Sequence, residues 1–213
     1  MDRNSSRTDE FTNALAESAP RYDVRLNAQA IRQLQDYYEL LLFWNTRLHL
    51  VAPCSPAEFA TRHVLESLCA LPHISEAARV VDVGSGAGLP IIPCLIAWPS
   101  FHATLIESSQ KKAIFLREAL RTVGAQGSSE LIAERFEMTL APEAEFITCR
   151  ALERMTKMFK QLLDWSPRAS TLLLFGGEAL RTEIEMFALT YQTIHIPESE
   201  RRFLFVIKKH PQT

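Results

Sequence analysis

Apolar residues recur at helical spacing in the first third of the chain and predict two amphipathic helices there. The first begins after Asn27, whose side chain can cap a helix, and its apolar positions lie three or four residues apart. The second begins at Ser55, where a proline follows directly and Glu58 stands at the third position, as in a capping box. Residues 1–22 lack this periodicity, so they predict a flexible tail with at most a marginal helix at residues 11–16.

From Arg79 onward, short apolar runs alternate with helical patterns. The runs that predict strands are residues 78–83, 101–107, 129–133, 145–150, 170–175, 190–196 and 201–209. The patterns that predict helices are residues 89–98, 109–123, a segment carrying Met155, Met158, Phe159, Leu162 and Leu163, and a segment carrying Leu180, Ile184 and Phe187. Such alternation is typical of an α/β fold with βαβ units and a mostly parallel sheet. The last two runs are too close for a crossover helix and predict an antiparallel hairpin at one edge.

These patterns predict three parts of the chain. Residues 1–22 form the tail, residues 23–78 a helical extension, and residues 79–213 the α/β domain.

Residues 80–90 read VVDVGSGAGLP and place three glycines between the first predicted strand and its helix. A glycine-rich turn at this place presents backbone N–H groups and a helix start at the carboxyl edge of a parallel sheet, where nucleotide-like ligands bind. A dinucleotide fold has G-x-G-x-x-G, but here Gly84, Gly86 and Gly88 form G-x-G-x-G, with Leu89 at the position of the third dinucleotide glycine. The departure favours S-adenosylmethionine, which has no pyrophosphate.

Two carboxylates are placed to meet such a ligand. Asp82 ends the first predicted strand and faces the ligand's amino end, directly or through water. Glu107 ends the second strand, and a carboxylate there can accept hydrogen bonds from ribose hydroxyls. The alternative is a tight turn with no ligand beside a solvated Glu107.

Composition and charge argue against several classes of protein function. The 213 residues are 47% apolar and carry a formal net charge of −2, so the chain can bury one core but has no overall basic field of the kind that marks many nucleic-acid binders. Its most apolar run, residues 89–99, is too short to span a membrane, and the N-terminus does not resemble a signal peptide. The four cysteines are widely spaced and without neighbouring histidines at ligand spacing, which predicts reduced, mostly buried thiols and no metal site. We expect a cytoplasmic monomer without membrane contact.

The motifs together resemble a known family. VDVGSGAGLPIIP followed by TLIESSQKKAIFLREAL is similar to the glucose-inhibited division protein B family, bacterial methyltransferases that modify N7 of a guanine in small-subunit ribosomal RNA. FWNTRLHLV, ATRHVLESL, ERFEM and ITCRAL resemble further segments of that family. The similarity runs from about residue 27 to residue 209.

The resemblance implies a class I S-adenosylmethionine methyltransferase, Rossmann-like, with a seven-stranded sheet and an N-terminal helical extension. Its substrate is then small-subunit (16S) ribosomal RNA, free or in a ribosomal particle. The turn motif and the resemblance together assign these residues to cofactor binding: Asp82, Gly84, Gly86, Gly88, Leu89, Glu107, Phe136, Glu137 and Arg150. The resemblance places Arg62, His63 and Arg150 around the reacting groups.

Three positions depart from the family pattern. His49 stands for an asparagine, Glu66 for an aspartate, and Phe175 for a lysine at the end of the fifth strand. A lysine there would place a cation near the substrate, whereas phenylalanine offers only a ring face, and its simplest role is to pack in the core. Two other functions therefore stay open: a diverged methyltransferase for a small molecule or another RNA, and a non-catalytic protein that binds the cofactor and RNA.

Overall fold

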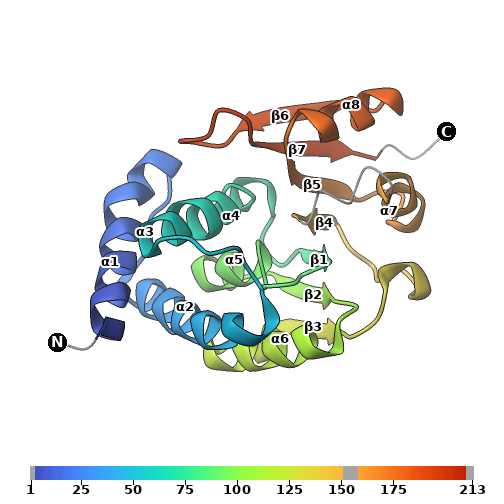
Figure 1. Cartoon of the computed structure of the whole chain (residues 1–213). Coiled ribbons are helices and arrows are strands. Elements are labelled where there is room, and N and C mark those ends of the chain that lie inside the picture. The colour runs from blue at the N-terminus through green and yellow to red at the C-terminus, as the bar shows by residue number, and fades with distance from the viewer. Residues whose placement is uncertain (1–2, 151–157, 210–213) are drawn as a thin grey trace.

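The structure, a computed structural model, describes residues 3–150 and 158–209 and centres on one seven-stranded sheet (Figure 1). The strands are β1 (Arg79–Val83), β2 (His102–Ile106), β3 (Ser129–Ile132), β4 (Phe146–Cys149), β5 (Thr171–Gly176), β6 (Tyr191–His195) and β7 (Phe203–Lys208). None of the helices in the described ranges combines the length and the apolar character needed to cross a lipid bilayer.

The strand order, β3-β2-β1-β4-β5-β7-β6, confirms the predicted mixed sheet. The strands β1 to β5 pair in parallel, whereas β7 lies antiparallel between β5 and β6. The order reverses at β1, from which β2 lies on one side and β4 on the other, so the carboxyl ends of these strands form the topological switch point where ligands of such folds bind.

Two hydrophobic cores cover the two faces of the sheet. The larger core lies under α2 (Ala28–Leu48), α5 (Ile91–Ala97) and α6 (Gln110–Thr122), and the smaller one under α7 (Phe159–Trp165) and α8 (Glu178–Met186). Successive residues of β1 alternate between them: Val80 belongs to the larger core and Val81 and Val83 to the smaller one. By the same alternation, Asp82 points to the side of the larger core.

The first helix corrects the prediction of a flexible tail. Residues 3–18 form α1 (Arg3–Ser18), and its Phe11 and Leu15 are fully buried. The ring of Phe11 stacks on Tyr38 of α2 with 4.4 Å between centroids. Two apolar residues one helical turn apart gave a weak signal in the sequence, but they are enough once α2 supplies the surface that covers them.

The predicted helix starts are confirmed. Asn27 Oδ1 accepts from Ala30 N at 2.8 Å, and Ser55 Oγ accepts from Glu58 N at 3.0 Å. The helix after Ser55 is not a uniform α-helix, because α3 (Pro56–Glu58) and α4 (Glu66–Leu68) flank the π-helical segment η2 (Phe59–Leu65). π-Helical turns occur often at functional sites.

The remaining predicted helices and strands are observed within the described ranges. The helix expected around residues 155–163 is seen only in part, as α7, because residues 151–157 lie outside the described residues. Cys94 and Cys149 are buried, and Cys54 and Cys69 are half-buried.

Candidate functional site

The turn between β1 and α5 has a left-handed backbone at all three glycines. The φ angles of Gly84, Gly86 and Gly88 are 72°, 54° and 83°, a region that a side chain would strain. The amide of Gly84 donates to Ile106 O of β2 at 2.9 Å. The turn is thereby fixed against the end of the neighbouring strand.

Packing between α5, α6 and the sheet disfavours any side chain at Gly88. A Cβ atom at this position would lie 2.4 Å from Cδ1 of Ile92 and 3.3 Å from Cδ2 of Leu116. The bare Cα therefore lets α5 begin close to the sheet and to α6, as a glycine in a strand-to-helix turn often does.

Glu107 links the turn to the following helix. Its side chain is nearly buried; Oε2 accepts from Gly86 N at 2.8 Å and Oε1 accepts from Ser109 N at 2.7 Å. Each carboxylate oxygen can accept more than one hydrogen bond, so these two bonds leave capacity for sugar hydroxyls.

Asp82 is fully buried beneath the turn. Its Oδ1 accepts from Thr148 Oγ1 at 2.7 Å, whereas Oδ2 has no hydrogen-bond partner among the described residues. Burial raises the pKa of Asp82 from 3.8 to about 7, against the opposing effect of the Thr148 hydroxyl. A buried carboxylate oxygen without a partner is costly, and a ligand that donates a hydrogen bond there would relieve that cost.

A cavity of about 310 Å³ opens at the carboxyl ends of β1, β2 and β4, on the side of the smaller core. Its lining residues are Val83, Gly84, Ile106, Ser108, Glu134, Arg135, Phe136, Glu137, Cys149, Met158 and Leu162. The apolar walls suit a flat aromatic base, and the polar groups at Ser108 and Glu137 can fix its orientation.

The structure brings together only some of the residues that the sequence assigned to the cofactor. Gly84, Phe136 and Glu137 line the cavity. The assigned residues outside its lining are Asp82, Gly86, Gly88, Leu89, Glu107 and Arg150. Gly86 belongs to the adjoining turn, Asp82 lies beneath the turn at the end of β1, and Glu107 binds the turn from the end of β2, whereas Gly88 and Leu89 pack in the larger core.

Arg150 ties the end of β4 to the helices before the sheet. Its Nη1 donates to His63 O at 3.0 Å and to Ser67 Oγ at 2.9 Å, and its Nη2 donates to the carbonyl of Arg62 and to Glu66 Oε1, the latter at 3.4 Å. Arg62 and His63 are thus held beside Arg150, and their backbone makes most of the contact, with Nδ1 of the His63 ring 3.4 Å from Nη2.

Glu66 is a buried carboxylate between two guanidinium groups. Besides Arg150, it faces Arg202 from the loop between β6 and β7, with Nε 3.1 Å from Oε2. Burial raises the pKa of Glu66, and both arginines oppose that rise. This carboxylate joins the helical extension to the C-terminal hairpin, a role that sequence reasoning missed because it depends on residues 136 positions apart (202 − 66).

His63 is neutral in this setting. Burial, and then the positive charges of Arg150, Arg62 and Arg202, lower the pKa of His63 from 6.5 to about 3. Its neighbour Arg62 is half-exposed and forms an ion pair with Glu58 one helical turn back. His63 is therefore a poor proton acceptor at neutral pH.

Phe175 lies in the core, as its strand position predicted. The ring is 3% exposed, and Cζ of Arg150 lies 6.0 Å from its centroid. The ring of Phe175 therefore packs against the guanidinium group of Arg150 and has no exposed face on which a base could stack.

Sequence reasoning also missed most of the cavity wall. Ser108, Glu134 and Arg135 follow directly after β2 and β3, so their place after a predicted strand was the available signal. Cys149, Met158 and Leu162 carried only an apolar signal, which does not separate a cavity wall from the core. Across residues 3–150 and 158–209, no group of three or more histidine, cysteine or acidic side chains is arranged to hold a metal ion.

The sequence has clear relatives. Residues 30–206 match the model of the GidB family, described as rRNA small subunit methyltransferase G. A protein named ribosomal RNA small subunit methyltransferase G from Nitrosomonas europaea is 39% identical over 149 residues, covering 68% of this chain and 69% of that protein. A protein of the same name from Xylella fastidiosa is 35% identical over 181 residues, covering 81% and 84%.

Solved structures share the fold at low sequence identity. An S-adenosylmethionine-dependent methyltransferase from Aquifex aeolicus superposes with a TM-score of 0.55 at 13% identity, over 71% of this chain and 93% of that chain. An O-methyltransferase from Bacillus cereus, in complex with S-adenosylhomocysteine, superposes with a TM-score of 0.58 at 16% identity, over 82% and 90%. These similarities confirm the predicted class I methyltransferase fold.

Proposed function

Because this chain belongs to the GidB family of rRNA small subunit methyltransferases G, we propose that it transfers a methyl group from S-adenosylmethionine to N7 of a guanine in small-subunit ribosomal RNA. Membership of the family makes the protein an S-adenosylmethionine-dependent methyltransferase. The observation that carries the proposal is the glycine turn and Glu107 at the switch point of the sheet, next to a cavity of about 310 Å³.

The described residues fit the cofactor. The apolar cavity beside Gly84 and Phe136 would hold the adenine, and Glu107 would accept hydrogen bonds from the ribose. The buried Oδ2 of Asp82 is the acceptor available for the amino end, directly or through water. When bound, the cofactor supplies a methyl carbon attached to a positively charged sulfur.

Attack by guanine N7 needs no general base, which agrees with the low pKa of His63. N7 carries an in-plane lone pair and no proton, so it attacks without prior deprotonation. A hydroxyl or phenol substrate would require a proton acceptor, and a histidine with a pKa of about 3 is too weak a base for that task. The protein's contribution is then alignment, which can lower the barrier by roughly 7–11 kcal/mol.

Three further properties stay predictions: that the substrate is the ribosomal particle, that the protein is a monomer, and that it is located in the cytoplasm.

The buried Phe175 supplies no cation of the kind that the family lysine provides, but Arg150 lies over its ring with the positive charge on the side of the helical extension. Arg150 and Arg202 share the counter-charge of Glu66, and Arg135 in the cavity wall adds another positive charge at this end of the sheet.

The test is a methyl-transfer assay with labelled donor. Small-subunit particles, naked small-subunit RNA and large-subunit RNA are offered separately, and the product is digested to nucleosides. The proposal expects 7-methylguanosine from small-subunit RNA or particles alone. Label at another atom or in large-subunit RNA would point to a diverged methyltransferase, and donor binding without any transfer would point to a binding protein.

A further inference from the structure

The outward side of α6 carries positive charges without a carboxylate partner in the part of the chain that the structure describes. Lys111, Arg117 and Arg121 are exposed, and none of the ion pairs between described residues includes them. At about 100° per residue they fall within roughly a third of the helix circumference. They form a positive stripe along the helix.

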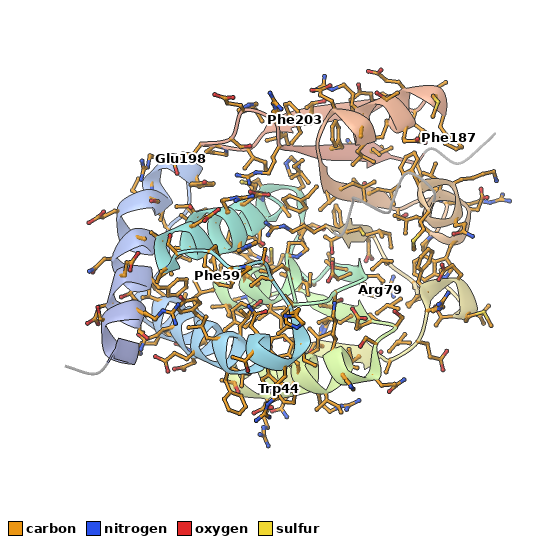
Figure 2. All side chains as sticks on the ribbon, in the orientation of Figure 1. Trp44, Phe59, Arg79, Phe187, Glu198 and Phe203 are labelled. Carbon is orange, nitrogen blue, oxygen red and sulfur yellow. The ribbon has the colours of Figure 1, made fainter. Side chains whose placement is uncertain are left out.

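The one acidic residue of α6 is hydrogen-bonded to α2. Glu118 is the single acidic residue in the sequence of α6, and its Oε2 accepts from Nε1 of Trp44 at 3.0 Å. Trp44 lies at the edge of the molecule where α2 and α6 run side by side (Figure 2). The indole thus orients this carboxylate towards α2, and within the described ranges Glu118 forms no ion pair with Arg117 or Arg121, so the stripe keeps a net positive charge.

Exposed apolar side chains lie beside the cations. Phe43 of α2 is 58% exposed with Cζ of Arg47 5.2 Å from its ring centroid, and Ile114 of α6 is 52% exposed. Ile114, Arg117 and Arg121 also line a shallow hollow together with Glu118 and Gln126. Cations interleaved with an exposed aromatic ring are typical of surfaces that bind single-stranded nucleic acid.

The stripe starts at the cavity. Ser108 lines the cavity, and the next residue, Ser109, caps α6 by accepting from Lys112 N at 3.4 Å. The 13 residues of α6 then extend for about 20 Å away from that edge. A polynucleotide whose target base lies beside the cofactor at this edge of the sheet can therefore extend along the helix.

We propose that the α2–α6 face, made by Phe43, Arg47, Lys111, Ile114, Arg117 and Arg121, binds the sugar-phosphate backbone of the substrate RNA at nucleotides away from the target guanine. The inference rests on the proposed function, which supplies an RNA substrate larger than the cavity. Charge complementarity selects the partner: unpaired guanidinium and ammonium groups with one ring for stacking match an RNA strand.

The experiment measures binding of naked small-subunit ribosomal RNA at several salt concentrations, without turnover. Arg117→Gln combined with Arg121→Gln removes two exposed charges from the face. We expect about tenfold weaker binding near 0.1 M salt and a salt slope that is smaller by about 1.4–1.8, since each phosphate contact contributes roughly 0.7–0.9. Affinity for S-adenosylmethionine and the rate of transfer at saturating RNA stay at the wild-type values.

The matched control is Arg168→Gln combined with Lys208→Gln. Both residues are exposed, and they lie on the β5–β7 side of the sheet, with Lys208 on β7, whereas α6 contacts β3 at the other edge. This variant loses the same charge and should keep the RNA affinity and the salt slope of the wild type. An unchanged slope in the first variant, or an equal loss in the control, overturns the proposed face.

A second variant separates stacking from charge. Phe43→Ser removes the exposed ring and should weaken RNA binding severalfold without changing the salt slope. RNA binding is measured separately from methyl transfer. The proposed RNA-binding face can therefore hold if the proposed methyl-transfer function fails, and the reverse. A wild-type protein that binds RNA but transfers no methyl sinks the proposed function, while the affinities still decide the α2–α6 face.

Discussion

The carboxylate of Glu107 holds the amide of Gly86 at 2.8 Å, so the acid at the end of β2 is part of the glycine turn itself. Its other oxygen holds the amide of Ser109 at 2.7 Å, where α6 begins. The turn, the start of α6 and the expected sugar acceptor therefore form one hydrogen-bonded unit.

Replacing Glu107 by glutamine should damage both the turn and the cofactor site. The new amide group can accept with one atom only, so one of the two backbone N–H donors loses its partner. We expect the free energy of unfolding to fall by about 1–3 kcal/mol and the affinity for S-adenosylmethionine to fall at least tenfold. Denaturant unfolding and calorimetry measure the two effects.

The control for this substitution is Glu130→Gln, which makes the same change on an exposed residue of β3. It should leave both quantities unchanged. A Glu107→Gln protein with the cofactor affinity of the wild type would show that this carboxylate does not contact the ligand.

Asp82 makes stability depend on pH in an unusual direction. Its pKa is about 7 in the folded protein against an ordinary 3.8, so the folded state binds the proton more tightly between these values. Its contribution to stability is complete below about pH 4 and is lost as the pH rises through about 7, a change of a few kcal/mol. Asp82→Asn should remove this part of the decline.

The measurement is the free energy of unfolding of the wild type and of Asp82→Asn at pH 4.5 and pH 7.5. Asp36→Asn, at an exposed position of α2, serves as the control. If Asp82→Asn and the wild type lose the same stability across this range, the buried carboxyl does not hold its proton.

The buried Glu66 should be more important for stability than any exposed acid nearby. Glu66→Gln leaves the guanidinium groups of Arg150 and Arg202 without their shared counter-charge, and breaking a buried ion pair in this way costs about 3–5 kcal/mol. Glu58→Gln breaks the exposed pair with Arg62 and should cost less than about 1 kcal/mol. Urea unfolding compares the two, and equal costs would contradict the role given to Glu66.

The strand pattern predicted the sheet well because each parallel strand is a short, apolar run bounded by a turn, and every such run before Arg150 became a strand. The glycines were correctly placed at the switch point. Their individual reasons were not visible, because Gly88 is required by contact with Ile92 and Leu116, and Leu116 lies 28 positions away (116 − 88).

Contacts between residues far apart in the sequence could not be predicted from the sequence. Arg150 was assigned to the cofactor, and its hydrogen bonds to the backbone of η2 and to Glu66 had no signal in the sequence. The packed α1 was missed for a similar reason, since Phe11 gains its burial from Tyr38 and Phe59, which belong to other helices.

His63 should not act as a proton acceptor. Its pKa of about 3 keeps the ring neutral across the physiological range, so the rate of methyl transfer should show no inflection from this group between about pH 5 and pH 9. His63→Gln should slow the reaction less than tenfold, and its pH profile should match that of the wild type. A loss of 100-fold or more, with a changed pH profile, would instead assign general-base catalysis to His63.

A crystal structure of the protein with S-adenosylhomocysteine tests the central claim most directly. We predict the adenine in the cavity beside Gly84, Ile106 and Phe136, with the ribose hydroxyls within hydrogen-bond distance of Glu107. An adenine bound elsewhere, or a Glu107 carboxylate that bonds only Gly86 and Ser109 in the complex, would contradict it.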